Sequence, residues 1–488
     1  MKIYKTIIVF LTACFLLTSC FEDNDDNAIS ASSINDFVWK SLNTWYFWQQ
    51  DVPDLADDRF SSNEEYADFL NSFDSPEDLF EHLKFGEDRF SWIVDDYFEL
   101  LNSFDGISKT NGMEFGLAQV SGSNDLIGFV EYILPNTDAQ AKGLKRGDLF
   151  LSVNGSQITL DNYIDLLFSD TDTYTINIAE YDGATVQPTD IDITLNKEPY
   201  SENPIFIEKT FEFEGKKIGY LMYTQFINDF DDELNNAFAN FKSSGIDELV
   251  VDLRYNLGGS SASAVHLSTM ITGQFTGDLF YTRVWNDKIL ADVSPDDLRV
   301  NFPNALPGGA SINGLNLNKV YILAQGSSAS ASELVINSLN PYIEVIHIGN
   351  TTRGKNEFSR TLFDVPQCSY VLSAACNDDP NPSHTWAIQP LLGRNANADG
   401  FFDFTDGLTP EPNFIVQENI FNLGVLGNLD EPLLARALQH SSGNGKSVNT
   451  KTTFDNFKII THSKLYKPNG DKMYINEIPQ EIIDVMYQ

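Results

Sequence analysis

One short stretch of this sequence constrains the fold more than any other, because an apolar run stops at small residues and then resumes with helical spacing. Residues 320–323 are apolar and suited to a strand, residues 326–332 are all Gly, Ser or Ala, and residues 334–339 follow a helical pattern. This order predicts a strand, a tight turn and a helix. A serine in the turn would place its hydroxyl at a helix N-terminus, where backbone N–H groups favour negative charge.

A second strand-and-loop unit follows directly. Residues 344–348 form a short strand pattern that ends at Gly349 and leads to Lys355, which follows a glycine. A serine and a lysine at the ends of strands in one sheet are the parts of a Ser–Lys nucleophile pair. A third block, residues 252–259, begins at the end of an apolar strand pattern and closes with two glycines.

In order and spacing, these three blocks resemble those of the tail-specific, or C-terminal-processing, serine proteases, and the resemblance extends from about residue 35 to about residue 435. It implies a crotonase- or ClpP-like α/β catalytic core. Position by position, it places the nucleophile at Ser330 and the general base at Lys355. It also implies oxyanion donors and supporting residues: Gly258, Gly259 and Ala331 for the oxyanion, and Ser359, Thr352 and Glu333 in support.

The chemistry of a Ser–Lys pair requires a neutral lysine, because a serine hydroxyl attacks poorly unless a base within hydrogen-bond reach removes its proton. Burial and a helix N-terminus both favour the neutral form of a lysine. Many members of the family carry glutamine four residues after the lysine, where this chain has Ser359. A serine can make the same hydrogen bond but reaches less far, so this departure concerns how Lys355 is held.

Each block also has an ordinary structural interpretation. A Ser/Ala run before a helix is commonly only a cap, and a Gly–Lys pair is commonly an exposed turn. A rival base among His266, His347 and His384 stays open, although histidines in such places are more often structural. Two non-catalytic alternatives also stay open: a catalytically inactive peptide- or polymer-binding envelope lipoprotein of the same fold, and a structural envelope lipoprotein that scaffolds partners.

The N-terminus resembles a bacterial lipoprotein signal peptide. Residues 1–19 carry two lysines and then an apolar run that is too short for a membrane span. Residues 17–20 resemble a lipobox, which implies cleavage before Cys20 and lipid attachment there; a plain secretory signal is the alternative. The acidic run that follows predicts a tether over residues 20–30, and it also resembles the export tag of surface lipoproteins. The resemblance implies a protein of the bacterial cell envelope, lipid-anchored to the outer membrane on its periplasmic or surface face.

The charge balance excludes some partners. Lys and Arg total 31 and Asp and Glu total 70, a formal charge of −39 that becomes −41 once the two lysines of residues 1–19 are removed. Such a surface repels nucleic acid and anionic lipid headgroups, so neither is expected as a partner. Two cysteines, Cys368 and Cys376, remain after the signal and the lipidation site are set aside. An even pair in a secreted protein predicts a disulfide, with two thiols or a metal pair near His384 as the alternative.

Beyond the leader, the patterns divide the chain into four parts. Helix-start signals and clustered aromatics predict a helical N-terminal segment, and strands alternating with helical patterns over residues 218–270 predict an α/β core. The bounds are residues 31–104 for the N-terminal helical domain, 105–200 for a PDZ-like domain, 205–435 for the serine protease core, and 441–488 for a tail with no assigned role.

The PDZ-like domain rests on residues 139–155, which resemble a PDZ block with a short helix, a glycine turn, an alternating strand and an Asn–Gly hairpin. Phe115, Gly116 and Leu117 would form the loop that binds a peptide carboxylate, and a helix containing Tyr163 would face it. In such a domain an extended peptide adds a strand to the sheet edge. The expected partners are therefore unfolded proteins or C-terminal peptides.

Two further segments carry weaker patterns. In the tail, which holds six of the 31 basic residues, residues 468–471 predict a hairpin. Near residue 400, oxygen-bearing side chains match the spacing of a calcium loop; a plain Asn/Asp/Gly turn is the alternative, and no other cofactor is expected. The candidate calcium ligands are Asn395, Asn397, Asp399, Asp403 and Asp406.

Overall fold

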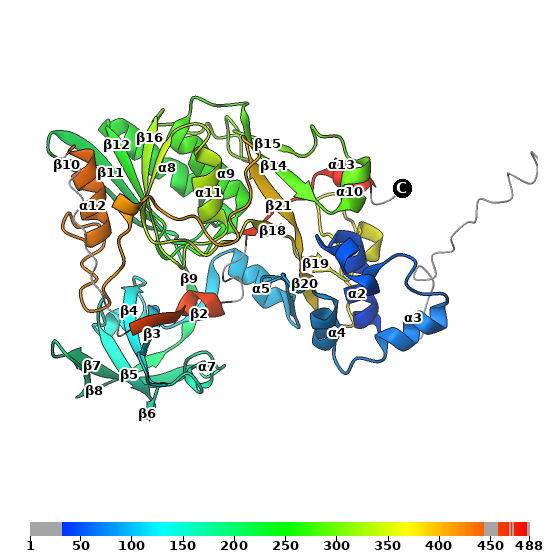
Figure 1. The fold of residues 1–488 in the computed structure, drawn as a ribbon, viewed down its shortest axis with the longest axis horizontal. Coiled ribbons are helices and arrows are strands. Elements are labelled where there is room, and N and C mark those ends of the chain that lie inside the picture. Colours follow the sequence, from blue (N-terminus) through cyan, green and yellow to red (C-terminus); the bar gives the residue numbers. More distant parts are fainter. Residues whose placement is uncertain (1–31, 444–456, 468–469, 471–472, 486–488) are drawn as a thin grey trace, which may run out of the picture.

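The computed structural model describes residues 32–443, 457–467, 470 and 473–485. Figure 1 shows an α/β core, a β-rich domain at the lower left and an N-terminal group of helices at the lower right. The predicted signal peptide, the lipidation site Cys20 and the acidic tether lie outside the described residues. Among the described residues, no helix combines the length and the apolar character needed to cross a bilayer.

The central sheet of the core carries the two strands that precede the serine and lysine loops. Its order is β10-β11-β12-β16-β17, with β10 antiparallel to β11 and the other neighbours parallel. Along these strands, apolar residues are buried at successive positions and therefore on both faces of the sheet. This is expected for a sheet that is covered on both sides. The strands are β10 (Ile205–Phe213), β11 (Lys216–Tyr223), β12 (Glu248–Asp252), β16 (Lys319–Ala324) and β17 (Glu344–Gly349).

Helices cover the two faces of this sheet. Val251 and Ile322 face one cluster with the helices α8, α9 and α11, and Val250 and Leu323 face a second cluster with α12. This alternation by single residues follows from the two-residue period of a strand. The helices of the core are α8 (Asp231–Ser244), α9 (Ser261–Thr272), α10 (Asp287–Asp292), α11 (Ala331–Leu339), α12 (Pro432–Ser441) and α13 (Gln480–Val485). The predicted α/β core, with its strands and helices in these places, is confirmed.

A second, six-stranded sheet joins segments that are far apart in the sequence. Its order is β13-β23-β18-β21-β14-β15, and the tail strand β23 lies between β13 and β18. The strands are β13 (Gly259–Ser260), β23 (Met473–Tyr474), β18 (Glu357–Ser359), β21 (Leu391–Asn397), β14 (Leu279–Trp285) and β15 (Arg299–Asn301). The hairpin predicted around residues 468–471 falls largely outside the described residues. Before it, residues 463–466 form a 3-10 turn, and after it β23 pairs with the core.

The N-terminal helices share the hydrophobic core of the α/β unit. Trp39 and Trp45 have no exposed surface, and Trp48 is buried beside them, so these aromatics belong to this core. Ser62 and Ser75 accept hydrogen bonds from backbone N–H groups three residues ahead, as predicted for helix caps. The helices are α2 (Ser33–Trp45), α3 (Asn63–Leu70), α4 (Pro76–Leu83) and α5 (Tyr97–Phe104). A three-stranded sheet lies beside them: β1 (Trp92–Val94), β20 (Ala387–Gln389) and β19 (Leu362–Phe363).

The β-rich domain has a core of its own and contains the predicted PDZ-like block. The short helix α6 (Asp138–Ala141) precedes β5 (Leu149–Val153), and Asn154 and Gly155 both take positive φ in the turn to β6 (Ser156–Gln157). The remaining elements are β2 (Ile107–Thr110), β3 (Met113–Val120), β4 (Leu126–Ile133), α7 (Tyr163–Leu167), β7 (Thr173–Tyr181), β8 (Val186–Asn196), β9 (Glu198–Ser201) and the tail strand β22 (Phe457–His462). The main sheet of this domain has the strand order β22-β3-β4-β5-β7-β8, so β22 forms its edge next to β3.

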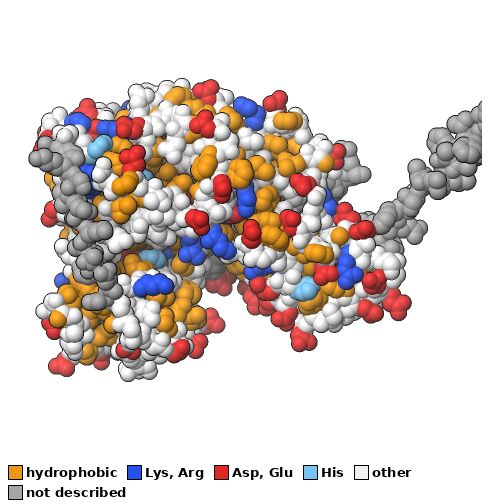
Figure 2. Space-filling model, viewed as in Figure 1, with side chains coloured by type: hydrophobic (Ala, Val, Ile, Leu, Met, Phe, Trp, Pro, Cys, Tyr) orange, Lys and Arg blue, Asp and Glu red, His pale blue; other side chains and the backbone are white. Residues whose placement is uncertain are grey.

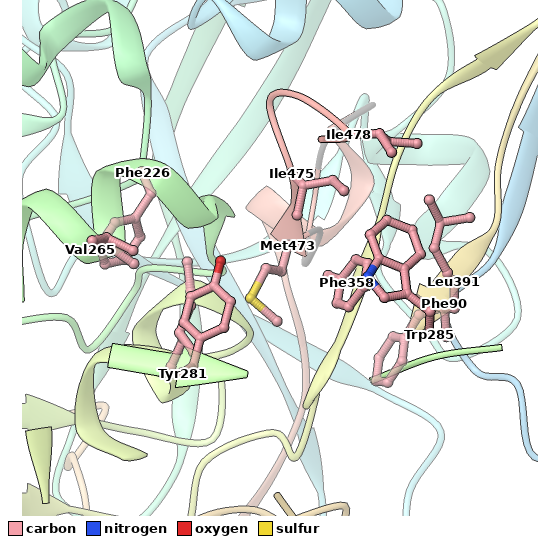
Figure 3. Packing of buried hydrophobic residues seen from close by; sticks show 14 of the residues in the cluster. Phe90, Phe226, Val265, Tyr281, Trp285, Phe358, Leu391, Met473, Ile475 and Ile478 are labelled. Atoms are coloured by element: carbon pink, nitrogen blue, oxygen red, sulfur yellow. The ribbon is translucent and has the colours of Figure 1, made fainter. Parts of the chain in front are cut away.

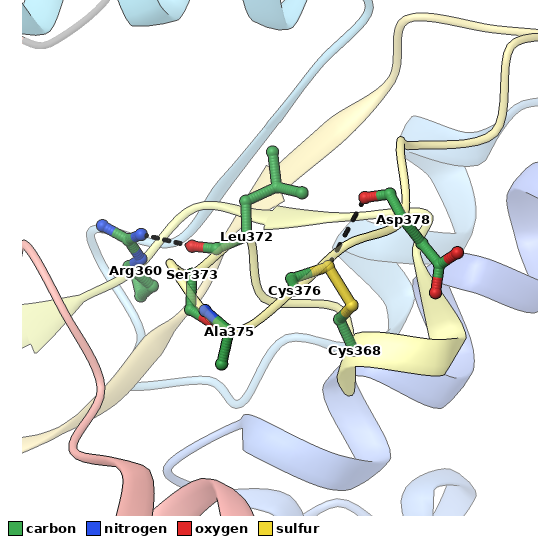
Figure 4. Close-up of a disulfide and its surroundings, with 7 residues drawn as sticks. All are labelled: Arg360, Cys368, Leu372, Ser373, Ala375, Cys376 and Asp378. Atoms are coloured by element: carbon green, nitrogen blue, oxygen red, sulfur yellow. Dashed lines mark hydrogen bonds between the residues drawn. A yellow bond between two sulfur atoms is a disulfide. The ribbon is translucent and has the colours of Figure 1, made fainter.

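The predicted disulfide between Cys368 and Cys376 is formed, with the two Cα atoms 5.6 Å apart (Figure 4). It closes a short loop between β19 and β20, and Cys368 packs in a small apolar cluster with Phe363 and Val365. The alternative of a metal pair near His384 is excluded, because both sulfur atoms are used in the bond.

Candidate active site

Ser330 lies in the turn between β16 and α11, at the start of the helix. Its φ is +67°, a conformation that is uncommon for a residue with a Cβ and costs free energy unless the surroundings hold it. The residue has no exposed surface, and its Oγ atom has no hydrogen-bond partner among the described residues. A strained backbone at a strand-to-helix turn is the local geometry expected of a nucleophile.

The other serines of the same run use their hydroxyls to hold the turn in place. Each donates to a main-chain carbonyl of the segment that follows β12: Ser327 to Arg254 (2.7 Å), Ser328 to Leu253 (2.7 Å) and Ser332 to Asn256 (3.0 Å). Of the four serines in this run, Ser330 alone has a hydroxyl without a hydrogen bond to any described residue. The run is therefore more than a helix cap, because three of its serines position the fourth.

Glu333 joins the serine loop to the lysine loop. Its Oε2 atom accepts from the backbone N–H of Ser330 (2.7 Å) and from that of Lys355 (2.9 Å). Its Oε1 atom accepts from the N–H of Gly354 (2.7 Å) and the hydroxyl of Thr352 (2.5 Å). Burial raises the pKa of Glu333, and these four donors oppose the shift. The predicted supporting residues Glu333 and Thr352 are thus both at the site, and one oxygen atom fixes the main chain of both candidate catalytic residues.

Lys355 is fully buried, and its surroundings include residues that the sequence patterns did not single out. Its Nζ atom lies 4.9 Å from the centre of the Phe90 ring. The neighbouring Arg89 donates to the carbonyl of Gly354 at 2.6 Å. Both residues come from the N-terminal segment, more than 260 positions away, and nothing in the local sequence marks them. The N-terminal segment therefore closes one side of the candidate site.

The Gly–Gly turn passes directly beside Ser330. A Cβ atom at Gly258 would lie 2.6 Å from the Cβ of Ser330, and one at Gly259 would lie 2.2 Å from the carbonyl oxygen of Phe226. Both glycines also have positive φ, 112° and 130°. The turn thus requires glycine for close approach and for conformation. The N–H of Gly258 donates to the Oδ1 of Asn256 at 2.9 Å, so this predicted oxyanion donor is engaged within the chain.

A buried ion pair anchors the block that leads to this turn. Arg254 has no exposed surface and pairs with Asp252 at 2.8 Å and with both carboxylate oxygens of Glu431. Glu431 also caps α12 by accepting from the N–H of Leu434. Burial alone would lower the pKa of Arg254, but these carboxylates outweigh it and raise the pKa. A charge buried this deeply needs such partners, and they fix the strand end from which the glycines follow.

Ser359, predicted to support Lys355, is engaged elsewhere. Its hydroxyl donates to the carbonyl of Met473 at 2.9 Å and accepts from the Nε2 of Gln389 at 3.0 Å. The first bond lies within the six-stranded sheet, where Ser359 pairs with the tail strand β23, and the second joins Ser359 to β20 of the three-stranded sheet. The role of Ser359 beside the lysine is therefore not supported by its hydrogen bonds.

Two of the three rival histidines pair with aspartates, and the third is buried in a strand. His266 bonds to Asp231 at 2.7 Å and His384 bonds to Asp364 at 3.1 Å. His347 lies in β17, where burial lowers its pKa to about 4. None of the three bonds to the Oγ of Ser330, which has no partner among the residues that the structure describes.

The calcium-loop candidate is built as a strand end and a turn. Asn395 and Asn397 lie in β21, and the Oδ1 of Asn397 accepts from the N–H groups of Asp399 and Phe401. Asp403 and Asp406 follow in a loop between β21 and a short 3-10 helix, Pro412–Phe414, and not between two α-helices. Within the part of the chain that the structure describes, no group of three His, Cys, Asp or Glu side chains is placed to hold a metal ion.

Family models match two parts of this chain. The family model described as peptidase family S41 matches residues 217–390, which include the serine loop, the lysine loop and the Gly–Gly turn. The model described as the peptidase S41 N-terminal domain matches residues 33–92, which include Arg89 and Phe90.

Two relatives carry names that describe processing proteases. A carboxyl-terminal-processing protease from Picosynechococcus sp. is 23% identical over 266 residues, which are 53% of this chain and 58% of that protein. A carboxy-terminal-processing protease from Bartonella bacilliformis is 28% identical over 272 residues, 53% of this chain and 56% of that protein. The match thus spans little more than half the length of these relatives.

Among solved structures, an S41 protease structure from Bacteroides fragilis NCTC 9343 superposes with a TM-score of 0.64. Its sequence is 24% identical, and the match covers 83% of this chain and 97% of that chain. At this identity the likeness establishes the shared fold alone.

Proposed function

Because the chain belongs to peptidase family S41, the family of the tail-specific, or C-terminal-processing, serine proteases, we propose that it is a serine endopeptidase in which Ser330 is the nucleophile and Lys355 the general base. One observation carries the assignment of the nucleophile: within the described part of the chain, Ser330 alone in its serine run keeps an unbonded hydroxyl, on a strained turn that three other serines hold. The shared contact of both residues with Glu333 supports the pairing with Lys355.

In the proposed mechanism, neutral Lys355 takes the proton of Ser330 while Oγ attacks the carbonyl carbon of the scissile peptide bond. The tetrahedral intermediate collapses, the C–N bond breaks, and Lys355 returns the proton to the leaving amine. Water then attacks the acyl-enzyme with Lys355 again as base, and this step releases the carboxylate product and frees Ser330. The burial of Lys355 supports this role, because burial favours the neutral form of a lysine.

Backbone N–H groups would stabilise the oxyanion. The N–H of Ala331 at the first turn of α11 and that of Gly259 are the proposed donors, and each such donor typically contributes about 3–4 kcal/mol to the transition state. Gly258 would join them only after its N–H leaves Asn256, to which it donates here at 2.9 Å. The helix dipole of α11 favours the same charge.

The proposed substrates are unfolded proteins and C-terminal peptides, because Ser330 can act only on a chain that enters in extended form. The β-rich domain, interpreted as PDZ-like, would present such chains. We place the protein in the bacterial cell envelope, where a lipid on Cys20 would hold it to the outer membrane.

A second candidate function is peptide binding without catalysis. The complete burial of Ser330 favours it, because the hydroxyl is closed to substrate in this conformation, and so does Ser359, because its hydroxyl bonds to Met473 and not to Lys355. A peptide-binding protein of this kind would leave an unfolded reporter intact at every pH.

The test is cleavage of an unfolded reporter protein by four proteins: the unsubstituted chain, Ser330→Ala, Lys355→Ala and the control Ser338→Ala. Ser338, a residue of α11, is a matched control because it too is a buried serine whose hydroxyl has no partner among the described residues. We expect each of the first two substitutions to lower kcat by at least about a thousandfold with little change in melting temperature, and Ser338→Ala to keep activity. Undiminished cleavage by folded Ser330→Ala would exclude the proposal.

A further inference from the structure

The C-terminal tail lies on the sheet edge that was predicted to bind peptides. β22 runs antiparallel to β3, with Thr461 opposite Leu117 and His462 opposite Gly116. At the end of this strand, the N–H of Phe115 donates to the hydroxyl of Ser463 at 2.9 Å. The residues predicted to bind a peptide are therefore bound to a peptide segment of the same chain, as Figure 1 shows for the red strand beside β3. This is strand addition to a sheet edge, the usual way in which such domains hold a ligand.

The tail also places a side chain in the groove between β3 and α7. The ring of Tyr466 stacks on Phe168 with centres 3.7 Å apart, and its hydroxyl bonds to that of Tyr163 at 3.0 Å. A cavity of about 520 Å³ adjoins this ring and is lined by Phe115, Phe168 and Lys197 among others. The groove therefore has room for more than the tail fills.

Three basic residues of the tail contact three buried glutamates that lie outside the tail. Glu131 bonds to His462 at 2.5 Å, Glu114 pairs with Lys467 at 2.6 Å, and Glu202 pairs with Lys464 at 3.4 Å. Each glutamate has at most 3% of its surface exposed. Burial alone would raise the pKa of Glu202, but the two lysines outweigh it and lower the pKa to about 2.

These glutamates define what else the site could hold. A buried carboxylate without a partner is costly, so removal of the tail requires either water or another basic ligand in its place. A free C-terminal carboxylate fits this site poorly, because Glu114 lies beside the N–H of Phe115 that would receive it and already accepts from Ser463 at 2.6 Å. The chemistry favours an internal segment with basic side chains over a chain end.

Beyond this edge, the tail continues to the turn next to Ser330. β23 pairs in parallel with β13, with Met473 opposite Gly259, and in parallel with β18, with Tyr474 opposite Ser359. Figure 3 shows Met473 and Ile475 enclosed by apolar side chains that include Phe226 and Phe358. The tail thus runs from the peptide-binding edge to the strand that holds the Gly–Gly turn.

We propose that the β3 edge of the β-rich domain is a binding site for extended internal peptide segments with basic side chains, and that residues 457–467 fill it in the resting chain as a built-in ligand. A substrate segment with the same chemistry displaces the tail and is thereby presented to Ser330. This inference rests on the proposed function for its consequence, but the binding site itself can be tested without catalysis.

The primary test is binding of a fluorescent, acetylated and amidated peptide of residues 457–467 to the full chain carrying Ser330→Ala, followed by anisotropy. One protein also carries His462→Ala, Lys464→Ala and Lys467→Ala, and the control instead carries Lys458→Ala, an exposed basic residue of the same strand. We expect the triple substitution to tighten peptide binding at least about tenfold, because it removes the internal competitor. Replacing the three basic residues of the peptide by alanine should weaken binding by a similar factor, and a free-acid peptide should bind no better than the amidated one.

Equal affinity for the triple variant and the control, or binding that depends on a free carboxylate, would overturn the proposal. If the triple variant fails to fold, hydrogen exchange on the chain without tail substitutions decides: excess peptide must speed exchange in β22 and leave α11 unchanged. Unchanged exchange in β22 overturns the proposal as well. Failed binding with intact proteolysis contradicts this inference alone, whereas intact binding with no proteolysis contradicts the proposed function alone.

Discussion

At the scale of single residues, the candidate site depends on one carboxylate that bonds to two loops. Glu333 accepts four hydrogen bonds, and two of them come from the backbone N–H groups of Ser330 and Lys355. Hydrogen bonds to a charged group contribute about 1.5–3 kcal/mol each, so this contact stabilises the relative position of the loops as well as the fold. Glu333 is a positioning residue, since it holds the main chain of both residues and not the reacting atoms.

We predict that Glu333→Gln lowers kcat about 10- to 100-fold with a smaller change in KM. An amide cannot accept all four donors, and misplacement of reacting groups by about 1 Å costs up to about a hundredfold in rate. Steady-state kinetics on an unfolded reporter, with a melting curve for each protein, measure the effect. Glu333→Asp keeps the charge and should recover part of kcat; identical kinetics in Glu333→Gln and the unsubstituted chain would contradict the positioning role.

The sequence identifies some of these residues and not others. Ser330, Glu333 and Lys355 lie in local strand-turn patterns whose chemistry can be inferred residue by residue. Phe90 approaches Lys355 only through tertiary packing across the whole core, and no local pattern encodes that approach. Ser359 was expected beside the lysine because it stands at a family position, but its hydroxyl bonds to the tail strand instead.

At the scale of elements, the periodic segments of the core were predictable and the tail was not. β16 and α11 follow strong local patterns, in which apolar residues recur with the period of a strand or a helix. The tail hairpin was predicted from a local Pro–Asn–Gly signal, but β22 and β23 pair with strands more than 100 residues away. Pairing over such separations is set by the shape and charge of the partner surface, which one segment of sequence does not contain.

The disulfide is an element-scale constraint that stability measurements can isolate. We predict that replacing Cys368 and Cys376 together by alanine lowers the free energy of unfolding by about 2–3 kcal/mol, as loop-closure entropy gives for a sequence separation of 8. Denaturant unfolding with and without reductant measures it. Reductant should destabilise the unsubstituted chain and leave the double variant unchanged, so an equal response of both proteins to reductant would contradict the assignment.

At the scale of the whole molecule, buried cations join the parts of a strongly acidic chain. Arg146 of the β-rich domain pairs with Glu418 at 2.7 Å and bonds to the hydroxyl of Tyr255 in the core at 2.7 Å. His462 and the two lysines of the tail likewise join the tail to the rest of the chain through buried glutamates. Figure 2 shows Lys and Arg side chains gathered where the surface is hollowed between the two lower lobes. Although the net charge of the chain is −39, positive charge is thus concentrated where its parts contact one another and in this hollow.

The contact between His462 and Glu131 makes the tail sensitive to pH. Burial lowers the pKa of His462, but the charge and hydrogen bond of Glu131 outweigh this effect, so the pKa is raised. Glu418 adds to the rise, and Arg353 opposes it. A raised pKa in the folded state means that this stabilisation is complete below the unfolded value of about 6.5 and is lost as pH rises through the folded value.

We therefore predict that amide exchange in β22, corrected for its intrinsic pH dependence, rises between pH 6 and pH 9. In His462→Gln the corrected exchange should be nearly independent of pH, because glutamine does not titrate. Hydrogen exchange followed by mass spectrometry measures both proteins under the same conditions. The same pH response in the two proteins would show that His462 is not the titrating group.

The most direct test of the central claim is to locate the nucleophile by covalent labelling. The mature chain is incubated with a fluorophosphonate probe, with and without excess peptide of residues 457–467, and the labelled residue is identified by peptide mass spectrometry. The account predicts one adduct, on Ser330, that forms faster with the peptide present and at least about a hundredfold more slowly in Lys355→Ala, while Ser338→Ala labels like the unsubstituted chain. An adduct on any other residue, or equal labelling of Ser330 without Lys355, would contradict it.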